Sequence, residues 1–204
     1  MRIFAIGRNY AEHITELNNE RPDEPVIFTK PDSALLHHNA AFVHPAFSKD
    51  IHHEIELVLK ISKEGKNISE QEALQYIESI GLGVDFTARD LQQKAKDKGL
   101  PWDIAKGFDH SAPISDTFFP IRHFSDLKNI NFSLQVDGQT RQNGNTSLML
   151  FPFDYIIAYL SKFFTLKPGD LIFTGTPKGV SAVKPGNRLT GFIENEKLLD
   201  FEVR

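Results

Sequence analysis

The 204-residue sequence predicts a β-rich α+β fold that forms one domain. Apolar and polar residues alternate in short runs, as they do in β-strands, and the clearest run spans residues 51–61. An Asp137-Gly138 pair between two further runs predicts a tight hairpin. Helical periodicity occurs only in isolated stretches between strands, so we expect helices inserted singly into a framework of sheets.

Composition and charge exclude several classes of protein. With a net charge of −4 and a pI near 6.1, the chain has no overall attraction for nucleic acid or acidic membranes. The absence of Cys excludes disulfides, zinc-thiolate sites, Fe–S clusters and thiol nucleophiles. The first apolar run is too short for a secretory signal, and no stretch approaches the roughly 20 residues of a transmembrane helix. We therefore expect a soluble cytoplasmic protein.

The N-terminal segment predicts a strand at residues 3–6 and a helix at residues 11–17. On this helix His13 and Glu16 are three residues apart and share one side. A His oriented by a carboxylate can act as a general base, although an exposed ion pair has the same spacing. Residues 18–25 are polar and contain two prolines, so they predict a loop that can move together with the helix.

A strand predicted at residues 26–30 and an irregular stretch lead to the alternating run 51–61. On that run His52, Glu54 and Glu56 share the face opposite to the apolar side chains. Two carboxylates on one face repel each other, and if the face is buried a cation has to offset the repulsion. Carboxylates suit a hard divalent ion such as Mg²⁺ or Mn²⁺. A strand with one solvated face is the alternative.

Two helix-capping patterns follow. Ser69 with Glu72 predicts the start of a helix that packs its apolar side on the core, with apolar positions Ala73, Leu74, Ile77 and Ile80. Thr87 with Asp90 predicts a second helix over residues 88–98, which a glycine closes.

A buried strand that ends at Asp85 precedes this second helix. An acid at the carboxyl end of a strand, beside a helix N-terminus, is a common position for a ligand-binding group. Arg89 and Gln92 project from the first turns of the helix. The lysines near its end predict a solvated surface, and they are Lys94, Lys96 and Lys98.

Residues 99–109 predict a turn and a short extended piece that carries Trp102 and Lys106. A Lys beside carboxylates and a metal ion can stabilise an oxyanion, although most lysines lie on the surface. Further on, a strand at 171–174 leads into the loop 175–179, where backbone N–H groups and the Thr176 hydroxyl can approach an anion.

The remaining predicted elements belong to the framework of the fold and carry no candidate site residue. They are a hairpin with strands at 132–136 and 139–143, a helix at 152–164 with proline in its first turn, and a final hairpin with strands at 188–193 and 197–203.

Six motifs are spread over most of the chain. They are Gly-Arg-Asn-Tyr-Ala-Glu-His at 7–13, His-His-Glu-Ile-Glu-Leu at 52–57, Asp-Phe-Thr-Ala-Arg-Asp-Leu-Gln at 85–92, Lys-Gly-Leu-Pro-Trp at 98–102 leading to Lys106, Arg141 leading to Thr-Ser at 146–147, and Thr-Gly-Thr-Pro-Lys-Gly-Val at 174–180. Together, and in this order, they resemble the fumarylacetoacetate hydrolase family, most closely its short single-domain acylpyruvase and oxaloacetate decarboxylase branch.

The resemblance implies a fold of rolled mixed β-sheets with a few peripheral helices, one catalytic domain over residues 1–204, and a homodimer. It implies one Mg²⁺ or Mn²⁺ per chain, held by Glu54, Glu56 and Asp85. The catalytic residues that it implies are His13, Glu16 and Lys106, with the His and Glu as a base dyad on a mobile lid over about residues 8–25. The substrate-binding residues that it implies are Arg8, Tyr10, Arg89, Gln92 and Thr176.

For activity, the resemblance implies a hydrolase that cleaves a C–C bond in acylpyruvates, which are 2,4-dioxo acids, through a metal-stabilised pyruvate enolate. Three carboxylates leave about three positions open on an octahedral ion, enough for a 2-oxo acid and a water. Oxaloacetate decarboxylation or tautomerisation uses the same enolate, and isomerases or decarboxylases of hydroxymuconate-type diacids have a similar metal motif. A non-enzymatic metal-binding protein, which would enclose its ion in protein ligands, is the alternative from another class.

Overall fold

The computed structural model describes residues 1–17 and 20–204. Residues 18 and 19, which belong to the predicted lid, lie outside the described residues. The α-helices are α1 Ala11–Glu16, α2 Glu70–Ala73, α3 Arg89–Lys98, α4 Asp103–Lys106 and α5 Phe153–Phe163. The strands are β1 Ile3–Gly7, β2 Val26–Lys30, β3 Leu35–Leu36, β4 Ile51–His53, β5 Ile55–Ile61, β6 Ile77–Val84, β7 Thr87–Ala88, β8 Ala112–Pro113, β9 Phe119–Pro120, β10 Asn131–Val136, β11 Gln139–Asn145, β12 Leu171–Phe173, β13 Ser181–Ala182, β14 Arg188–Ile193 and β15 Glu196–Glu202.

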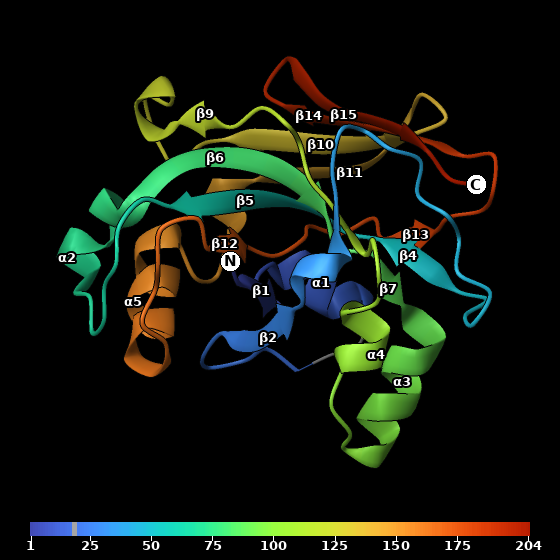
Figure 1. Ribbon diagram of the computed structural model, residues 1–204, viewed down its shortest axis with the longest axis horizontal. Helices are drawn as coiled ribbons and strands as arrows, with labels where there is room; N and C mark the ends of the chain where they lie inside the picture. Colours follow the sequence, from blue (N-terminus) through green and yellow to red (C-terminus); the bar gives the residue numbers. More distant parts are fainter. Residues whose placement is uncertain (18–19) are drawn as a thin grey trace.

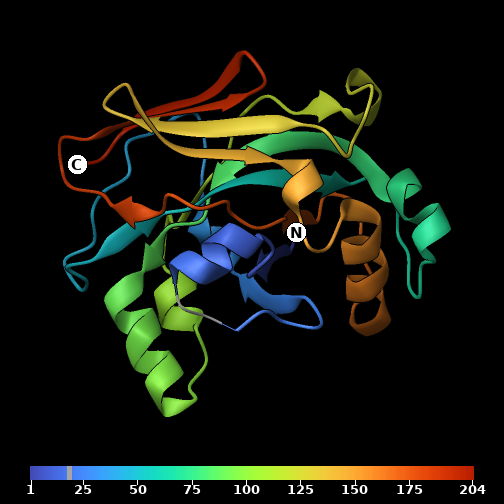
Figure 2. The same cartoon turned by 180° about the vertical axis from the view of Figure 1, so that it is seen from behind.

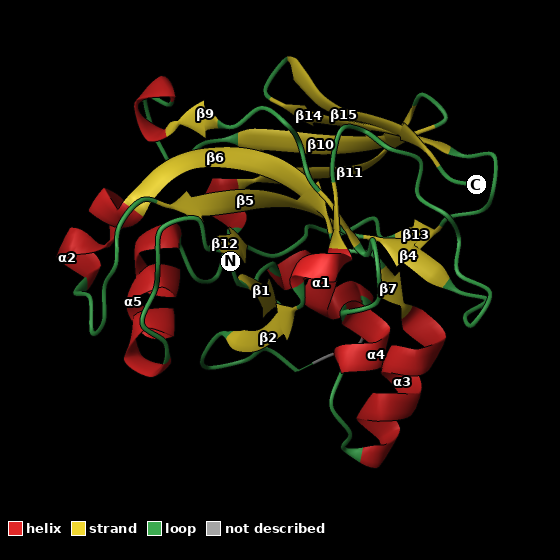
Figure 3. Cartoon of the chain, in the orientation of Figure 1, coloured by secondary structure: helices red, strands yellow, loops and turns green. Residues whose placement is uncertain are grey.

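Four sheets make up the described part of the chain (Figure 3). The largest has the strand order β2-β1-β12-β5-β6-β9, and a four-stranded sheet has the order β11-β10-β14-β15. Two small sheets, β13-β4-β7 and β3-β8, complete the framework. The β1–β12 pair is parallel whereas β1–β2 and β5–β6 are antiparallel, so the six-stranded sheet is mixed. The predicted β-rich α+β class is confirmed.

The main core lies between the two larger sheets. The four-stranded sheet lies across β5 and β6, as Figures 1 and 2 show from opposite sides. Fully buried side chains of both sheets, among them Leu57, Leu82 and Phe132, belong to one apolar cluster. α2 and α5 pack together at one end of the molecule, and α3 and α4 pack together at the other (Figure 1). α1 lies between these two ends.

Both predicted hairpins are confirmed. β10 and β11 are antiparallel and are joined at Asp137 and Gly138, which have φ angles of 52° and 75°. Positive φ at both central residues matches the twist of a two-residue hairpin, which explains the Asp-Gly pair. β14 and β15 form the final hairpin.

The prediction of one continuous strand over residues 51–61 is wrong. The run is interrupted at Glu54, because β4 pairs with β7 and β13 whereas β5 pairs with β6 and β12. At the break the carbonyl of Glu54 accepts the backbone N–H of Asp85 at 2.8 Å. Both faces of β5 are covered and Glu56 is 2% exposed, so the alternative of a solvated face is excluded.

The prediction of a long helix after Ser69 is also wrong. α2 spans one turn, and Ile77 and Ile80 belong to β6, which pairs along most of its length with β5. The sheet pairing overrides the helical spacing of these residues. The Ser69 hydroxyl bonds the Glu72 carboxylate at 2.7 Å and does not cap a backbone N–H.

Two local predictions around α3 need correction. Thr87 lies in β7 and does not cap α3, and Asp90 accepts hydrogen bonds from the Ser48 hydroxyl and the Leu91 N–H. The segment that carries Lys106 is the short helix α4 and not an extended piece. Gly99 does close α3, with a φ of 63°. Among the described residues, no helix is long and apolar enough to cross a membrane.

Asp170, in the turn before β12, ties the N-terminus to the six-stranded sheet. Its buried carboxylate accepts the backbone N–H groups of Arg2 at 3.0 Å and Lys167 at 2.9 Å, and it pairs with the Arg2 guanidinium. We expect Asp170→Ala to lower the free energy of unfolding by about 2 kcal/mol, because these donors lose their partner. Urea denaturation measures the change. Glu78→Ala, which breaks an exposed pair with Lys60, is the control and should cost less than about 1 kcal/mol; equal losses would contradict this account.

Candidate active site

The three predicted metal ligands meet at one point. Glu54 lies in the break between β4 and β5, Glu56 lies two residues further along in β5, and Asp85 directly follows β6. The antiparallel pairing of Ile55 with Val84 brings these positions together. One carboxylate oxygen from each acid lies within 4.8 Å of the other two. The three residues are 5%, 2% and 0% exposed, so their charges are almost completely removed from water.

Two buried lysines face the acids. Lys106, the last residue of α4, donates hydrogen bonds to Glu54 Oε2 at 2.8 Å and Asp85 Oδ2 at 2.6 Å. It also donates to the Thr87 hydroxyl at 2.6 Å. Lys30, the last residue of β2, places its Nζ 2.8 Å from Asp85 Oδ1. Together the two lysines balance the buried charges of Glu54 and Asp85.

The same burial has opposite results for the two glutamates. For Glu54, burial disfavours the charged form, but the charges of Lys106 and Arg89 outweigh it and hold the pKa well below its usual value. For Glu56, burial and the charges of Asp85 and Glu54 raise the pKa well above its usual value. Without a further cation, the protonated form of Glu56 is therefore favoured more strongly than that of an exposed glutamate.

The donor set fits a hard divalent cation. All three ligands are carboxylates, which Mg²⁺ and Mn²⁺ prefer. Asp85 Oδ1 is buried, and the Lys30 ammonium lies 2.8 Å from it as an ion pair. The cavity beside the acids has a volume of about 30 Å³, which is enough for an ion or a water. Three protein ligands would leave part of an octahedral shell open to a ligand.

His13 faces the acids from α1. Its side chain lines the cavity, and its Nδ1 lies 3.2 Å from Glu16 Oε2. Because a carboxylate accepts the hydrogen bond, the proton of the neutral ring belongs on Nδ1, and Nε2 is left as the acceptor. Burial lowers the pKa of His13, although Glu54 and Glu16 oppose the shift. The imidazole is therefore neutral near pH 7 and able to accept a proton.

Glu16 also fastens α1 to the loop 175–179. Its other oxygen, Oε1, accepts the backbone N–H of Gly179 at 3.0 Å, and Glu12 pairs with Lys178 at 3.2 Å. In this arrangement α1 lies at the cavity, and His13 and Leu17 line it. The movement of this segment remains a prediction.

Two glycines shape the loop 175–179. Gly175 has a φ of 104°, and a Cβ there would lie 2.6 Å from Asn9 Cβ. Its N–H donates to Glu56 Oε2 at 2.6 Å. Gly179 has a φ of 99°, and a Cβ there would lie 2.0 Å from the Arg141 carbonyl oxygen. Side chains at these positions would push the loop away from the acids.

The structure brings most of the other predicted residues to the same cavity. The cavity is lined by four of the predicted substrate-binding residues, namely Arg8, Arg89, Gln92 and Thr176. Arg89 pairs with Glu54 and donates to Gln92 Oε1 at 2.6 Å. Tyr10 is not among the described lining residues, because it is buried in the core against Phe132. His52 turns away and bonds Asp50 at 2.8 Å.

Several residues of the site were missed by the sequence analysis. Lys30 is the last residue of β2, and no pattern in the sequence distinguishes it from a surface lysine. Its 3% exposure and its ion pair with Asp85 show that it belongs to the site. Gln142 accepts from His53 Nδ1 at 2.8 Å and donates to the Thr176 hydroxyl at 2.7 Å, so it positions the loop from β11. The prediction that Lys96 belongs to a solvated helix end is wrong, because its side chain is partly buried and lines the cavity.

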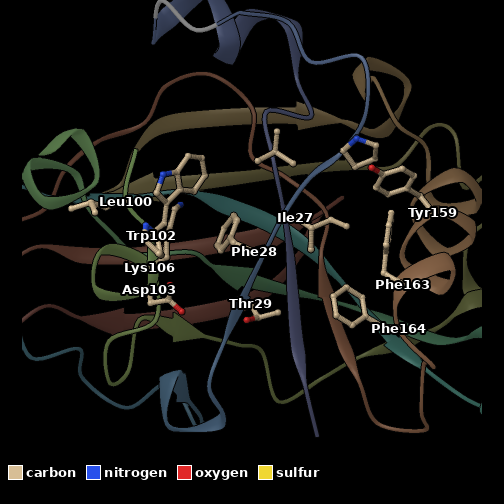
Figure 4. A pocket seen from close by; sticks show the side chains of 13 residues that line it. Ile27, Phe28, Thr29, Leu100, Trp102, Asp103, Lys106, Tyr159, Phe163 and Phe164 are labelled. Atoms are coloured by element: carbon tan, nitrogen blue, oxygen red, sulfur yellow. The ribbon is translucent and has the colours of Figure 1, made fainter. Parts of the chain in front are cut away.

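A larger hollow of about 670 Å³ borders the cavity on the outer side of β2 (Figure 4). Most of its lining is apolar and comes from β2, residues 100–102 and α5. Phe28, Trp102 and Lys106 line both spaces. The rings of Phe28 and Trp102 lie 5.9 Å apart and separate the acids from the hollow.

The family described as "Fumarylacetoacetate (FAA) hydrolase C-terminal" matches residues 2–200. The chain belongs to the fumarylacetoacetate hydrolase family. The structure is similar to that of fumarylpyruvate hydrolase from Pseudomonas aeruginosa in complex with Mn²⁺ and pyruvate. The TM-score between the two structures is 0.94 and the sequences are 38% identical, with 100% of this chain and 89% of that chain covered. That likeness extends over the whole length of this chain.

Two named relatives from other organisms support the assignment of the chain to this family. The chain is 42% identical over 201 residues to oxaloacetate tautomerase FAHD1 of Bos taurus, with 98% of this chain and 90% of the relative covered. It is 47% identical over 186 residues to oxaloacetate decarboxylase of Dictyostelium discoideum, with 91% and 85% covered. Both relatives are named mitochondrial, so the cytoplasmic location expected for this chain stays a prediction.

Metal binding to this fumarylacetoacetate hydrolase site should depend on pH. Because the pKa of Glu56 is raised, a cation and a proton compete for this carboxylate, and the apparent affinity should increase with pH, by up to about tenfold per pH unit below that pKa. Calorimetric titration of the metal-free protein with Mn²⁺ between about pH 6 and 8 measures this, with proton release as the second readout. An affinity that is constant or falls as the pH rises would contradict the assignment.

Proposed function

We propose that this chain is a Mg²⁺- or Mn²⁺-dependent enzyme that hydrolyses acylpyruvates to pyruvate and a carboxylic acid. One observation carries the proposal: a neutral base, His13, and a buried cation, Lys106, line one cavity with the acidic triad. A non-enzymatic ion site needs neither of them. The family and the Mn²⁺ and pyruvate of the Pseudomonas aeruginosa structure support the same conclusion.

The chain's own residues account for the proton transfers. A bound ion would polarise the 2-keto oxygen and stabilise the enolate that forms. His13 Nε2 takes a proton from water while the water oxygen attacks the distal carbonyl carbon. The bond between that carbon and the methylene then breaks, and its electron pair becomes the enolate of pyruvate as the acid leaves. His13 returns its proton to the enolate carbon, which completes the balance.

Two further residues assist this reaction. Glu16 holds the imidazole in the tautomer that leaves Nε2 free. Lys106 keeps its ammonium beside the carboxylates, where a positive charge favours the developing oxyanion. Homodimer formation, which the family resemblance implies, belongs to this proposal.

Oxaloacetate decarboxylation or tautomerisation is a second candidate function. The names of the bovine and Dictyostelium discoideum relatives favour it. Loss of CO₂ from oxaloacetate leaves the same enolate and needs no attacking water, so it depends less on His13. The two reactions share the acids and Lys106.

Glu54→Ala should abolish metal-dependent turnover, because it removes a ligand and leaves the Lys106 and Arg89 charges without their partner. The assay is a panel of acylpyruvates, oxaloacetate and hydroxymuconate-type diacids with Mg²⁺, with Mn²⁺ and with EDTA. Glu78→Ala, far from the cavity, is the control. Unchanged turnover in Glu54→Ala, or turnover that survives EDTA, would refute the site.

His13→Ala should lower kcat for acylpyruvate hydrolysis by about 10²-fold or more, the usual contribution of a general base. Oxaloacetate decarboxylation should lose much less, since no water has to be activated. Steady-state kinetics on both substrates gives the ratio of the two losses. Equal losses would count against His13 as the base and in favour of a role in closing the cavity.

A further inference from the structure

A chain of hydrogen-bonded side chains leads from a small sheet to the wall of the acidic cavity. It begins at Ser181 in β13 and passes through His53 in β4 and Gln142 in β11 to Thr176 in the loop 175–179. His53 and Gln142 are 0% exposed, and Thr176 is 4% exposed. Of these four residues, Thr176 alone lines the cavity. Any effect of the others on a bound substrate therefore passes through the Thr176 side chain.

The side-chain amide of Gln142 has one possible orientation. Its Oε1 lies 3.0 Å from the backbone nitrogen of Ile55, which can only donate, and its Nε2 lies 2.9 Å from the carbonyl oxygen of Pro177, which can only accept. The reversed amide would place two donors together at Ile55 and two acceptors together at Pro177. These two backbone groups therefore fix which end of the amide faces His53 and which end faces Thr176.

This orientation sets the direction of the hydrogen bonds on both sides of the amide. Because Gln142 Oε1 can only accept, the ring of His53 carries a proton on Nδ1, which lies 2.8 Å away. Because Gln142 Nε2 can only donate, the hydroxyl oxygen of Thr176 accepts at 2.7 Å. Both hydrogens and both acceptor positions of the amide are then in use, so Gln142 is held without a free hydrogen-bonding group.

The Thr176 hydroxyl is left with a proton to donate. Among residues 1–17 and 20–204, the Gln142 amide is the one hydrogen-bond partner of its oxygen, and that bond uses a lone pair. A hydroxyl that accepts on one side can donate on the other, and Thr176 borders the cavity of the acidic triad. Hydrogen bonds to ionised oxygens are shorter and stronger than those between neutral groups. The chain therefore prepares Thr176 to donate to an anionic oxygen.

We propose that Gln142 is a positioning residue that holds the Thr176 hydroxyl as a donor to an anionic oxygen of the bound 2-oxo acid, while His53 holds Gln142. This inference rests on the proposed function and deepens it. The alternative is that the chain only fastens the loop 175–179 to the sheets. The two roles differ in their effect on the metal site, because the neighbouring Gly175 N–H donates to Glu56 Oε2 at 2.6 Å. A displaced loop would disturb this contact, and the metal affinity would change with it.

The test measures the affinity for pyruvate on Mn²⁺-loaded protein and the affinity for Mn²⁺ on metal-free protein, both by calorimetry. Thr176→Val, which removes the hydroxyl and keeps the shape, should weaken pyruvate binding about tenfold, as expected for one bond to a charged group. Gln142→Glu should have a similar effect, because a carboxylate cannot donate and draws the Thr176 proton away from the cavity. Thr176→Ser should retain most of the pyruvate affinity. The Mn²⁺ affinity should stay within about twofold in all three variants.

The double variant separates positioning from fastening. If Gln142 acts through the Thr176 hydroxyl, Gln142→Glu combined with Thr176→Val should bind pyruvate at most about twofold more weakly than Thr176→Val alone. Losses that add, a parallel loss of Mn²⁺ affinity, or unchanged pyruvate binding in Gln142→Glu would overturn the proposal. Gln139→Glu makes the same exchange at an exposed position of β11 and is the matched control. It should change neither affinity.

A spectroscopic measurement on the wild type needs no variant to fold. Two-bond ¹H–¹⁵N correlation spectra of histidine-labelled protein show which ring nitrogen of His53 carries a proton, and we expect Nδ1. A ring protonated on Nε2 alone would reverse the chain and overturn the proposal. If the wild type binds pyruvate but hydrolyses no acylpyruvate, the hydrolase proposal fails, and the binding data still decide the role of Gln142. If it hydrolyses acylpyruvates while the variants bind pyruvate as the wild type does, the hydrolase proposal stands and the role of Gln142 is refuted.

Discussion

Three carboxylates buried together with two lysines and an arginine are the constraint on which the rest of the site depends. None of these charges could remain in the interior alone, since the desolvation of a single ion costs several kcal/mol. Lys106 contacts Glu54 and Asp85, Lys30 lies beside Asp85 as well, and Arg89 pairs with Glu54. Glu56 is left with a raised pKa and marks the place where a further positive charge belongs.

The sheets supply the rigidity that such a group needs. The acids come from a break between two strands and from the end of the neighbouring strand, and both elements are covered on both faces. The parts that meet a substrate come from less regular segments: a short helix, a glycine-bounded loop and one face of α3. This division fits a family in which related sheets serve substrates of different kinds.

Prediction from the sequence succeeded where local signals and sheet pairing agree. The Asp137-Gly138 hairpin and the end of α3 at Gly99 follow from residues that accept positive φ. It failed at residues 69–80, where helical spacing and strand pairing compete and the sheet decides. The acids were found because carboxylates at alternate positions of an apolar run are unusual, and the family resemblance joined Asp85 to them.

Other residues of the site could not be predicted from the sequence, because their roles depend on neighbours from distant segments of the chain. Lys30 and Lys96 differ from surface lysines only in what surrounds them, and the surroundings come from distant segments. Gln142 acts through a hydrogen-bond chain from β11 to the loop, which no spacing in the sequence records. Tyr10 lies within a family motif and packs in the core, where its hydroxyl is buried without a hydrogen-bond partner, and burial and the Glu56 charge raise its pKa.

Glu16 uses its two oxygens for different purposes, one on the imidazole and one on the backbone of Gly179. The contact that holds α1 against the loop and the contact that orients the base therefore depend on the same carboxylate. If α1 lifts from the loop, the imidazole loses part of its support at the moment when bulk water enters. Such a dependence would restrict the attack on a carbonyl to the enclosed state and would protect an enolate from stray protonation while the cavity is open.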